Sequence, residues 1–282
     1  MIYLFTVAAS PRLGTKLYSR LLTTQQSYCY HQLTALLHPY PSNWTLKDVG
    51  FPPQADDHNF EQAQRCGVLE CYPDYYARLW ERAQFGEHII GNSDPGALDI
   101  LPGLWMLWPE MKIIFSKRNG VSRVQSSFVH RAHFPKMEFA RYETTFQTSD
   151  FFAQCCHLWV EGVKLMNQSK QWLRGEALCL EASLGALTSD IGEIKRIWDW
   201  LGIGQWDGYE ERNRQVMATL ANAGTNGRAV AGWEKIWDGW TPEQRAAVRD
   251  ICGETQRSHG YLLRAIEAPG AARPWHARLA GR

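Results

Sequence analysis

Residues Ser10 to Leu17, which read Ser-Pro-Arg-Leu-Gly-Thr-Lys-Leu, have the composition of an anion-binding turn. They follow a short apolar run that starts at Ile2 and suits a buried strand, and they precede leucines at helical spacing. A strand, a turn of small residues and a helix together direct backbone N–H groups and the positive end of the helix toward an anion. The alternative is an ordinary strand-to-helix turn, as found in any α/β protein.

The turn differs from the common loop that binds nucleoside triphosphates. That loop has the pattern G-x-x-x-x-G-K-[ST]. Here Ala9 stands where the pattern requires its first glycine, and Gly14 is followed by Thr15 and then Lys16, in the reverse order. The turn therefore indicates an anion site of another class.

The elements that must position this turn alternate between strands and helices. Four further strands are predicted after the first: one from Ser27 to about His31, then His88–Gly91, Met111–Ser116 and Ala177–Glu181. Residues Asn92–Gly96 read as a turn by composition. Alternating strands and helices imply an α/β fold of three layers, with a central, mostly parallel sheet flanked by helices on both faces.

The second half of the chain is mostly helical. One helix is predicted from apolar residues at three- and four-residue steps, namely Phe152, Cys156, Trp159, Val163 and Met166. A second begins at Ser189 as its N-cap and ends at Gly202. A third begins with the capping box at Thr241, runs to His259 and stops at Gly260.

Length and composition limit the function classes. A chain of 282 residues with a net charge of +1 gives no support for nucleic-acid or membrane-surface binding. No window approaches the ~20 apolar residues of a membrane span, and the apolar start lacks the basic region of a secretion signal. The 7 cysteines show no zinc-binding or disulfide spacing, which favours reduced thiols and a cytoplasmic protein.

Four stretches in order along the chain resemble the sulfotransferases that use 3′-phosphoadenosine 5′-phosphosulfate (PAPS). The turn at 10–17 is similar to the family's 5′-phosphosulfate loop, P-[RK]-S-G-T-T-x-L. Residues 112–128 resemble its 3′-phosphate element, a strand ending in Arg with Ser eight residues later. Residues 178–203 resemble the region before the C-terminal segment, and 226–241 resemble that segment, which closes over the nucleotide. The resemblance implies a P-loop-like fold in one domain, residues 1–268, with an acceptor lid at 39–87 and a frayed tail at 269–282.

The resemblance also implies which residues hold PAPS and its product PAP. The resemblance assigns the 5′-phosphosulfate to the loop and the 3′-phosphate to an arginine and a serine. The arginine would supply two parallel N–H donors and the serine a hydroxyl. No metal is expected. Two departures from the family pattern, Leu13 for Ser and Lys16 for the second Thr, leave open whether Arg12 or Lys16 faces the bridging oxygen. The predicted nucleotide-binding residues are Ser10, Arg12, Leu13, Gly14, Thr15, Lys16, Leu17, Arg118, Ser126, Arg228 and Trp233.

Transfer of the sulfuryl group in line to a hydroxyl or amine requires a base near the loop. His31 is the first candidate, because it ends the second predicted strand and because Tyr30-His31-Gln32 resembles the His-Glu or His-Asp pair of some bacterial and phage members. A neutral imidazole also has a suitable pKa. Asp94 is the alternative base or an anchor for the acceptor. A structural histidine and a turn-forming aspartate are the competing interpretations.

The acceptor is left open between a small molecule, a sugar and a peptide. Aromatic residues in 39–87 suit stacking on any of these, or they pack beneath the lid. Two other functions stay as alternatives: a P-loop kinase or phosphoryl transferase, and a non-catalytic protein that binds PAPS or PAP. The sequence does not indicate an oligomeric state.

Overall fold

The computed structural model describes residues 3–9, 13–31, 88–94, 97–98, 101, 105, 110–133, 145–173, 178–223 and 232–261. The predicted lid at 39–87, the tail at 269–282 and the predicted site residues Ser10, Arg12 and Arg228 lie outside these ranges. The chain divides into two compact units, residues 1–117 with 164–230, and residues 118–163 with 231–282. The extent predicted for a single domain, 1–268, stays a prediction.

The first unit contains a sheet of five strands in the order β2-β3-β1-β4-β5, and every pairing is parallel. The strands are β1 (Tyr3–Ala8), β2 (Ser27–His31), β3 (Ile89–Asp94), β4 (Lys112–Lys117) and β5 (Cys179–Ser183). Apolar and β-branched residues fill the middle of β1 and β4, as expected where both faces of a parallel sheet are covered. The predicted parallel sheet is confirmed.

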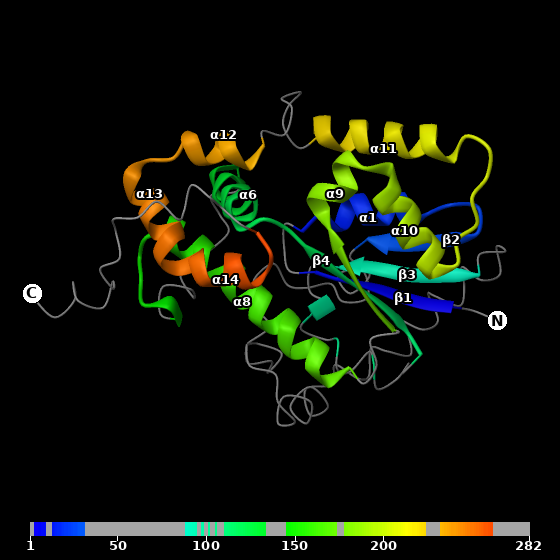
Figure 1. Ribbon diagram of the computed structural model, residues 1–282, viewed down its shortest axis with the longest axis horizontal. Helices are drawn as coiled ribbons and strands as arrows, with labels where there is room; N and C mark the ends of the chain where they lie inside the picture. The colour runs from blue at the N-terminus through cyan, green and yellow to red at the C-terminus, as the bar shows by residue number, and fades with distance from the viewer. Residues whose placement is uncertain are drawn as a thin grey trace, which may run out of the picture. The chain divides into compact units, whose positions relative to one another are not determined.

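Four helices share a hydrophobic core with one face of this sheet. They are α1 (Thr15–Leu22), α9 (Leu184–Ser189), α10 (Ile191–Leu201) and α11 (Tyr209–Ala223), and Figure 1 shows them grouped beside the strands. Phe5 and Val7 of β1 share a buried cluster with Leu21 of α1 and Trp198 of α10. The apolar sides of α1, α9 and α10 therefore face the sheet, and α11 packs against α1 and α10.

The long helix α8 (Phe151–Trp172) reaches the opposite face with its last turns. The ammonium of Lys170 lies 5.4 Å from the ring centre of Phe115 in β4 and pairs with Glu181 of β5. Ile114, the residue before Phe115, belongs to the core on the α1 side, because successive side chains of a strand point to opposite faces. Helices thus lie on both faces, as the three-layer prediction requires.

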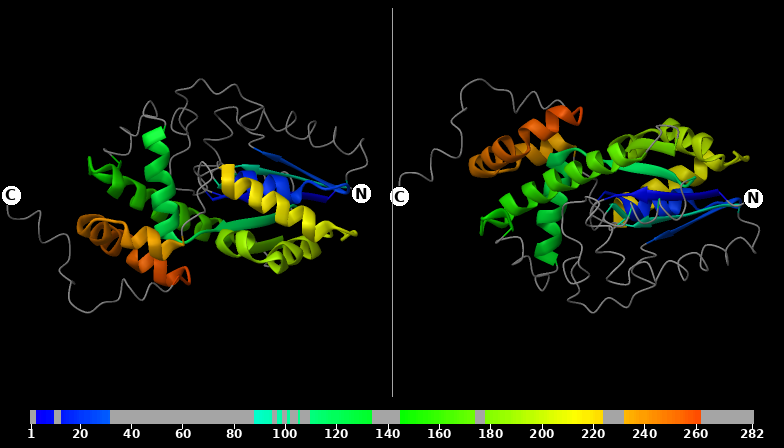
Figure 2. Two further views of the ribbon diagram at one scale, coloured as in Figure 1. Left: turned by 90° about the horizontal axis from the view of Figure 1, so that it is seen from above. Right: turned by 90° about the horizontal axis from the view of Figure 1, so that it is seen from below.

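The second unit is helical. It contains the first part of α8 together with α6 (Gly120–His133), α12 (Trp233–Asp238), α13 (Pro242–Ala247), the π-helical turn η3 (Val248–Cys252) and α14 (Gly253–Ser258). Figure 2 shows α6 beside the C-terminal helices from two further directions. The predicted apolar stripe of α8, from Phe152 to Met166, is buried as expected. Within the part of the chain that the structure describes, no helix is long and apolar enough to cross a membrane.

Some predicted boundaries are confirmed and others are wrong. The capping box at Thr241 and the left-handed glycines Gly202 and Gly260 stand where they were predicted. Ser189, however, is the last residue of α9, and Asp190 caps α10 by accepting a hydrogen bond from the Gly192 N–H. A carboxylate one residue later therefore sets the start of that helix.

The prediction of a turn at residues 92–96 is wrong for the first three of these residues. Asn92, Ser93 and Asp94 continue β3, where Ser93 pairs with His31 of β2 and Asp94 pairs with Ala8 of β1. Pairing with neighbours on both sides overrides the turn preference of these residue types. The polar residues therefore lie inside the sheet, at its carboxyl end.

Candidate active site

The carboxyl ends of β1 and β4 form the topological switch point of the sheet. From β1 the chain passes to the β2 side of the sheet, whereas from β4 it passes to β5 on the other side. In open α/β sheets a ligand binds outside the carboxyl ends of strands at such a point. The loop after β1, predicted from its residues to bind an anion, leaves the sheet there.

This loop is attached to β4 by a buried hydrogen bond. The hydroxyl of Ser116 donates to the backbone carbonyl of Leu13 over 2.9 Å, and Ser116 is buried. Sequence reasoning missed the role of Ser116, although a polar residue within the apolar run Lys-Ile-Ile-Phe-Ser was a usable signal. The bond fixes the loop beside the switch point.

Gly14 forms the N-cap of α1 in a left-handed conformation, with φ of 82°. Glycine adopts this conformation without the steric penalty that other residues carry. Space is restricted as well, because a Cβ atom at Gly14 would lie 2.4 Å from a methyl carbon of Leu184. Backbone conformation and packing both require glycine at this position.

The first turn of α1 is open toward the loop. The N–H groups of Leu17 and Tyr18 donate to the Gly14 carbonyl at 2.8 and 3.1 Å, so the N–H groups of Thr15 and Lys16 precede the first bonds of the helix. Gly14 has no side chain to cap them. These N–H groups and the positive end of the helix are therefore available to an anion.

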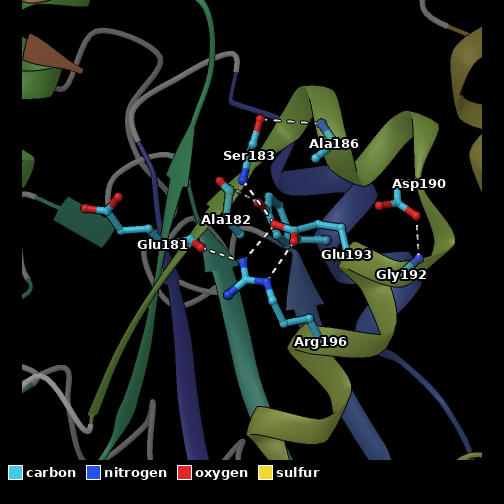
Figure 3. Close-up of polar contacts among 9 residues, drawn as sticks. Glu181, Ala182, Ser183, Ala186, Asp190, Gly192, Glu193 and Arg196 are labelled. Atoms are coloured by element: carbon cyan, nitrogen blue, oxygen red, sulfur yellow. Dashed lines mark hydrogen bonds and ion pairs between the residues drawn. The ribbon is translucent and has the colours of Figure 1, made fainter. Parts of the chain in front are cut away.

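The neighbouring helices α9 and α10 have N-termini that are capped by side chains. Ser183 accepts from the Ala186 N–H at the start of α9, and Asp190 does the same for Gly192 at the start of α10 (Figure 3). Arg196 of α10 pairs with Glu193 and donates to the Glu181 carbonyl over 2.7 Å, which holds the end of β5. Compared with α9 and α10, the N-terminus of α1 is the one left open.

The predicted loop residues differ in exposure. Lys16 is exposed, Thr15 is half-buried, and Leu13 and Leu17 are buried in the core. The side chains of the two leucines therefore belong to the core, and the Leu17 N–H is already bonded to the Gly14 carbonyl. An exposed ammonium beside an open helix end adds to the positive potential of the site.

His31 ends β2, as predicted, and faces the first turn of α1. Its Nε2 lies 3.3 Å from the hydroxyl oxygen of Thr15. Burial lowers the pKa of the imidazole, the negative charge of Asp94 opposes this shift, and the positive charge of Lys16 adds to it. A half-buried imidazole with a lowered pKa is neutral at pH 7, which is the form a general base needs.

Asp94 is the last residue of β3 and is 3% exposed. It lies in the sheet next to the strand that carries His31, and its charge acts on that imidazole. The first unit thus brings together four predicted residues: Thr15, Lys16, His31 and Asp94. The alternation of side chains along β3 places Asp94 and Ser93 on opposite faces.

Arg118 and Ser126, the predicted 3′-phosphate residues, belong to the second unit. Arg118 directly follows β4, Ser126 lies within α6, and both are half-buried. The start of α6 is already capped, because Asn119 accepts from the Val121 N–H at 2.8 Å and Gln256 accepts from the Gly120 N–H at 3.3 Å. An anion at α6 would therefore depend on side chains rather than on these backbone groups.

Trp233, a further predicted nucleotide residue, is the half-buried first residue of α12. The segment that it begins is attached to α6, since the indole N–H of Trp240 donates to the side-chain carbonyl of Gln125 over 2.6 Å. Gln125 is the residue before Ser126. A hydrogen bond thus joins the C-terminal segment to the helix that contains the predicted 3′-phosphate serine, within one unit.

Comparison of the sequence with family models gives one match that covers most of the chain. The model described as "Sulfotransferase family" matches residues 5–208. Among curated proteins, none matches the sequence. The matched region includes most of β1, the other four strands of the sheet and the open end of α1.

Solved structures with a similar fold are also sulfotransferases. The sulfotransferase domain of the Synechococcus PCC 7002 olefin synthase is 15% identical with a TM-score of 0.60, and the match covers 93% of this chain and 96% of that one. A sulfotransferase from Alicyclobacillus acidocaldarius is 14% identical, with a TM-score of 0.55 and coverage of 94% and 98%. Mouse sulfotransferase SULT7A1, complexed with PAP, is 14% identical, with a TM-score of 0.54 and coverage of 90% and 85%. At these identities the likeness shows the fold alone.

Proposed function

The chain belongs to the sulfotransferase family and is a sulfuryl-transferring enzyme, and we propose that its donor is PAPS and that the acceptor group is a hydroxyl or an amine. The observation that carries this proposal is the open N-terminus of α1, with the imidazole of His31 beside it. One element binds an anionic group, and the other accepts a proton next to it. In-line sulfuryl transfer needs both.

The proposed donor site has two parts. The 5′-phosphosulfate lies at the open end of α1, with Lys16 and Arg12 as cations and the backbone of Thr15 and Lys16 as N–H donors. Ser10, Leu13 and Leu17 complete this loop. The 3′-phosphate lies with Arg118 and Ser126, and Arg228 and Trp233 belong to the segment that closes over the nucleotide. The PAP complex of a sulfotransferase of similar fold supports this choice of donor.

The proposed reaction proceeds by a direct displacement on sulfur. The acceptor oxygen or nitrogen attacks the sulfur as its proton passes to His31, and the bond from sulfur to the bridging oxygen breaks with its electron pair leaving on PAP. Positive charge at the loop offsets the charge that develops on that oxygen. Asp94 orients the acceptor or the imidazole. None of these steps requires a metal.

The acceptor is proposed as a small molecule, a sugar or a peptide. The predicted lid, 39–87, lies outside the described residues, so the choice depends on experiment. A screen of phenols, sugars and peptides with labelled PAPS would identify the acceptor class from the labelled product.

Isothermal titration with PAP, PAPS and ATP tests the donor. We expect PAP to bind with a nanomolar to micromolar dissociation constant in the absence of magnesium, because two anionic groups meet cationic side chains. Binding of ATP that requires magnesium, without binding of PAP, would overturn the proposal in favour of phosphoryl transfer. Tight binding of PAPS without transfer to any acceptor would indicate a binding protein.

A further inference from the structure

The hydrogen bond between Thr15 and His31 joins the two parts of the proposed reaction. Thr15 is the first residue of α1, at the open helix end, and His31 is the last residue of β2. They are 16 residues apart, and the Thr15 hydroxyl oxygen lies 3.3 Å from Nε2 of the imidazole. Both backbones are fixed, one by the helix and the other by pairing with Ser93. The contact therefore follows from the fold.

The direction of this hydrogen bond depends on whether Nε2 of His31 carries a proton. A threonine hydroxyl has a single proton to donate, and an imidazole nitrogen accepts only when it carries none. Burial and Lys16 favour the neutral ring over the opposing charge of Asp94. In a neutral ring whose Nε2 accepts from Thr15, the ring proton lies on Nδ1. The lone pair that a base needs is then already engaged.

We propose that Thr15 is a positioning residue that engages His31 Nε2 in the donor-free enzyme and releases it when the donor binds. This inference rests on the proposed function, in which the phosphosulfate occupies the open end of α1 beside Thr15. His31 is then free to act as a base only in the donor complex. An acceptor that arrives first finds the imidazole nitrogen occupied.

Release follows from the nature of the donor group. The oxygens of a phosphate or phosphosulfate accept hydrogen bonds and donate none at neutral pH. The Thr15 hydroxyl can therefore bond to them only as the hydrogen-bond donor. The hydroxyl proton cannot bond to Nε2 at the same time. The freed Nε2 takes the proton of the acceptor as the new bond to sulfur forms and the bond from sulfur to PAP breaks.

Nitrogen NMR of His31 tests the first half of this proposal in the free protein. The Thr15→Val variant loses a hydrogen bond to the neutral ring, so the pKa of His31 should rise by about 0.5–1 pH unit. Thr15→Ser keeps the hydroxyl and should restore the wild-type value. Thr188→Val is the control, because the Thr188 hydroxyl bonds to the carbonyls of Leu184 and Gly185 in α9. An equal His31 pKa in wild type and Thr15→Val would overturn the proposal.

Addition of PAP tests the second half, with its 5′-phosphate standing in for the phosphosulfate. The His31 signals of wild type and Thr15→Val, which differ in the free proteins, should converge in the complexes, because Thr15 then bonds to the nucleotide. A difference that persists unchanged in the PAP complexes overturns the release and leaves the proposed function intact. Failure of PAP to bind the wild-type protein overturns the proposed function, and the release with it.

Discussion

Gly14 of the proposed anion-binding loop lies directly against Leu184 at the start of α9. A Cβ atom added to Gly14 would come within 2.4 Å of one methyl carbon of Leu184 and 3.0 Å of the other. Leu184 is buried, so it cannot turn away without disturbing the core. The junction between β5 and α9 therefore constrains a loop that leaves the sheet from β1, two strands away.

Replacement of Gly14 by alanine should destabilise the protein through two separable effects. A left-handed alanine is strained by ~1–2 kcal/mol, and overpacking against Leu184 should add about 1 kcal/mol more. Gly202→Ala is the matched control, because Gly202 also has a positive φ, of 87°, but nothing lies within 4 Å of an added Cβ. Urea unfolding should show the larger loss for Gly14→Ala. Equal losses of unfolding free energy in the two variants would mean that the added Cβ at position 14 is not destabilised by its contact with Leu184.

Arg212 of α11 should be important for stability at the other end of α1. Its guanidinium donates to the backbone carbonyls of Arg20 and Leu21 in the last turn of α1 and of Thr23, its C-cap. Arg212→Met should lower the free energy of unfolding by ~2–3 kcal/mol, because three carbonyls, two of them in part-buried contacts, lose a charged donor. Arg214→Met is the control on the same helix, where an exposed pair with Glu210 should be worth less than about 0.5 kcal/mol.

The sequence alone was enough to predict the sheet and most helix ends, because these depend on local patterns. Apolar runs of strand length indicated the strands, and the capping box at Thr241 and the glycine at 202 marked helix ends that the structure confirms. Two predictions were wrong: Asp190 and not Ser189 caps α10, and Asn92–Asp94, whose residue types are typical of turns, form a strand. Pairing with β1 and β2 decides that segment, and the pairing is not encoded locally.

The contacts that define the site depend on strand order and could not be predicted. Thr15 meets His31 only because α1 packs beside β2, which is separated from β1 by β3. Ser116 holds Leu13 across 103 residues of chain. Sequence patterns placed Thr15, Lys16 and His31 at the ends of their elements, and the topology brings those ends together.

The proposed 3′-phosphate contact predicts a selective loss of affinity. Arg118→Ala should weaken PAP binding by ~2–3 kcal/mol, as expected for a charge-assisted hydrogen bond. Adenosine 5′-phosphosulfate lacks the 3′-phosphate, so it should bind poorly to the wild-type protein and be little affected by the variant. Isothermal titration of both ligands measures this, with Arg214→Ala as an exposed control. Equal PAP affinity in wild type and Arg118→Ala would contradict the assignment.

Activity should depend on pH through His31, and Asp94 should set the position of that dependence. The base acts when neutral, so kcat/KM should fall as pH drops through the lowered pKa of His31, below its ordinary value of about 6.5. The charge of Asp94 raises the pKa of His31, and Asp94→Asn should therefore move the acid limb to still lower pH. A pH–rate profile of both proteins with an identified acceptor tests the direction. A shift to higher pH would show that Asp94 does not act on His31 by charge.

The role of His31 as the base predicts a loss of turnover without a loss of nucleotide affinity. His31→Ala should reduce kcat by about 10²–10⁴-fold. PAP affinity should stay nearly unchanged, because a base contacts the acceptor and not the phosphates. Asp94→Ala should reduce turnover less, since a residue that orients the acceptor or the imidazole takes up no proton. Steady-state kinetics together with PAP titration separate the possibilities. A large loss of PAP affinity in His31→Ala would point to a nucleotide-facing or structural histidine, and a turnover loss confined to Asp94→Ala would assign the base to that carboxylate.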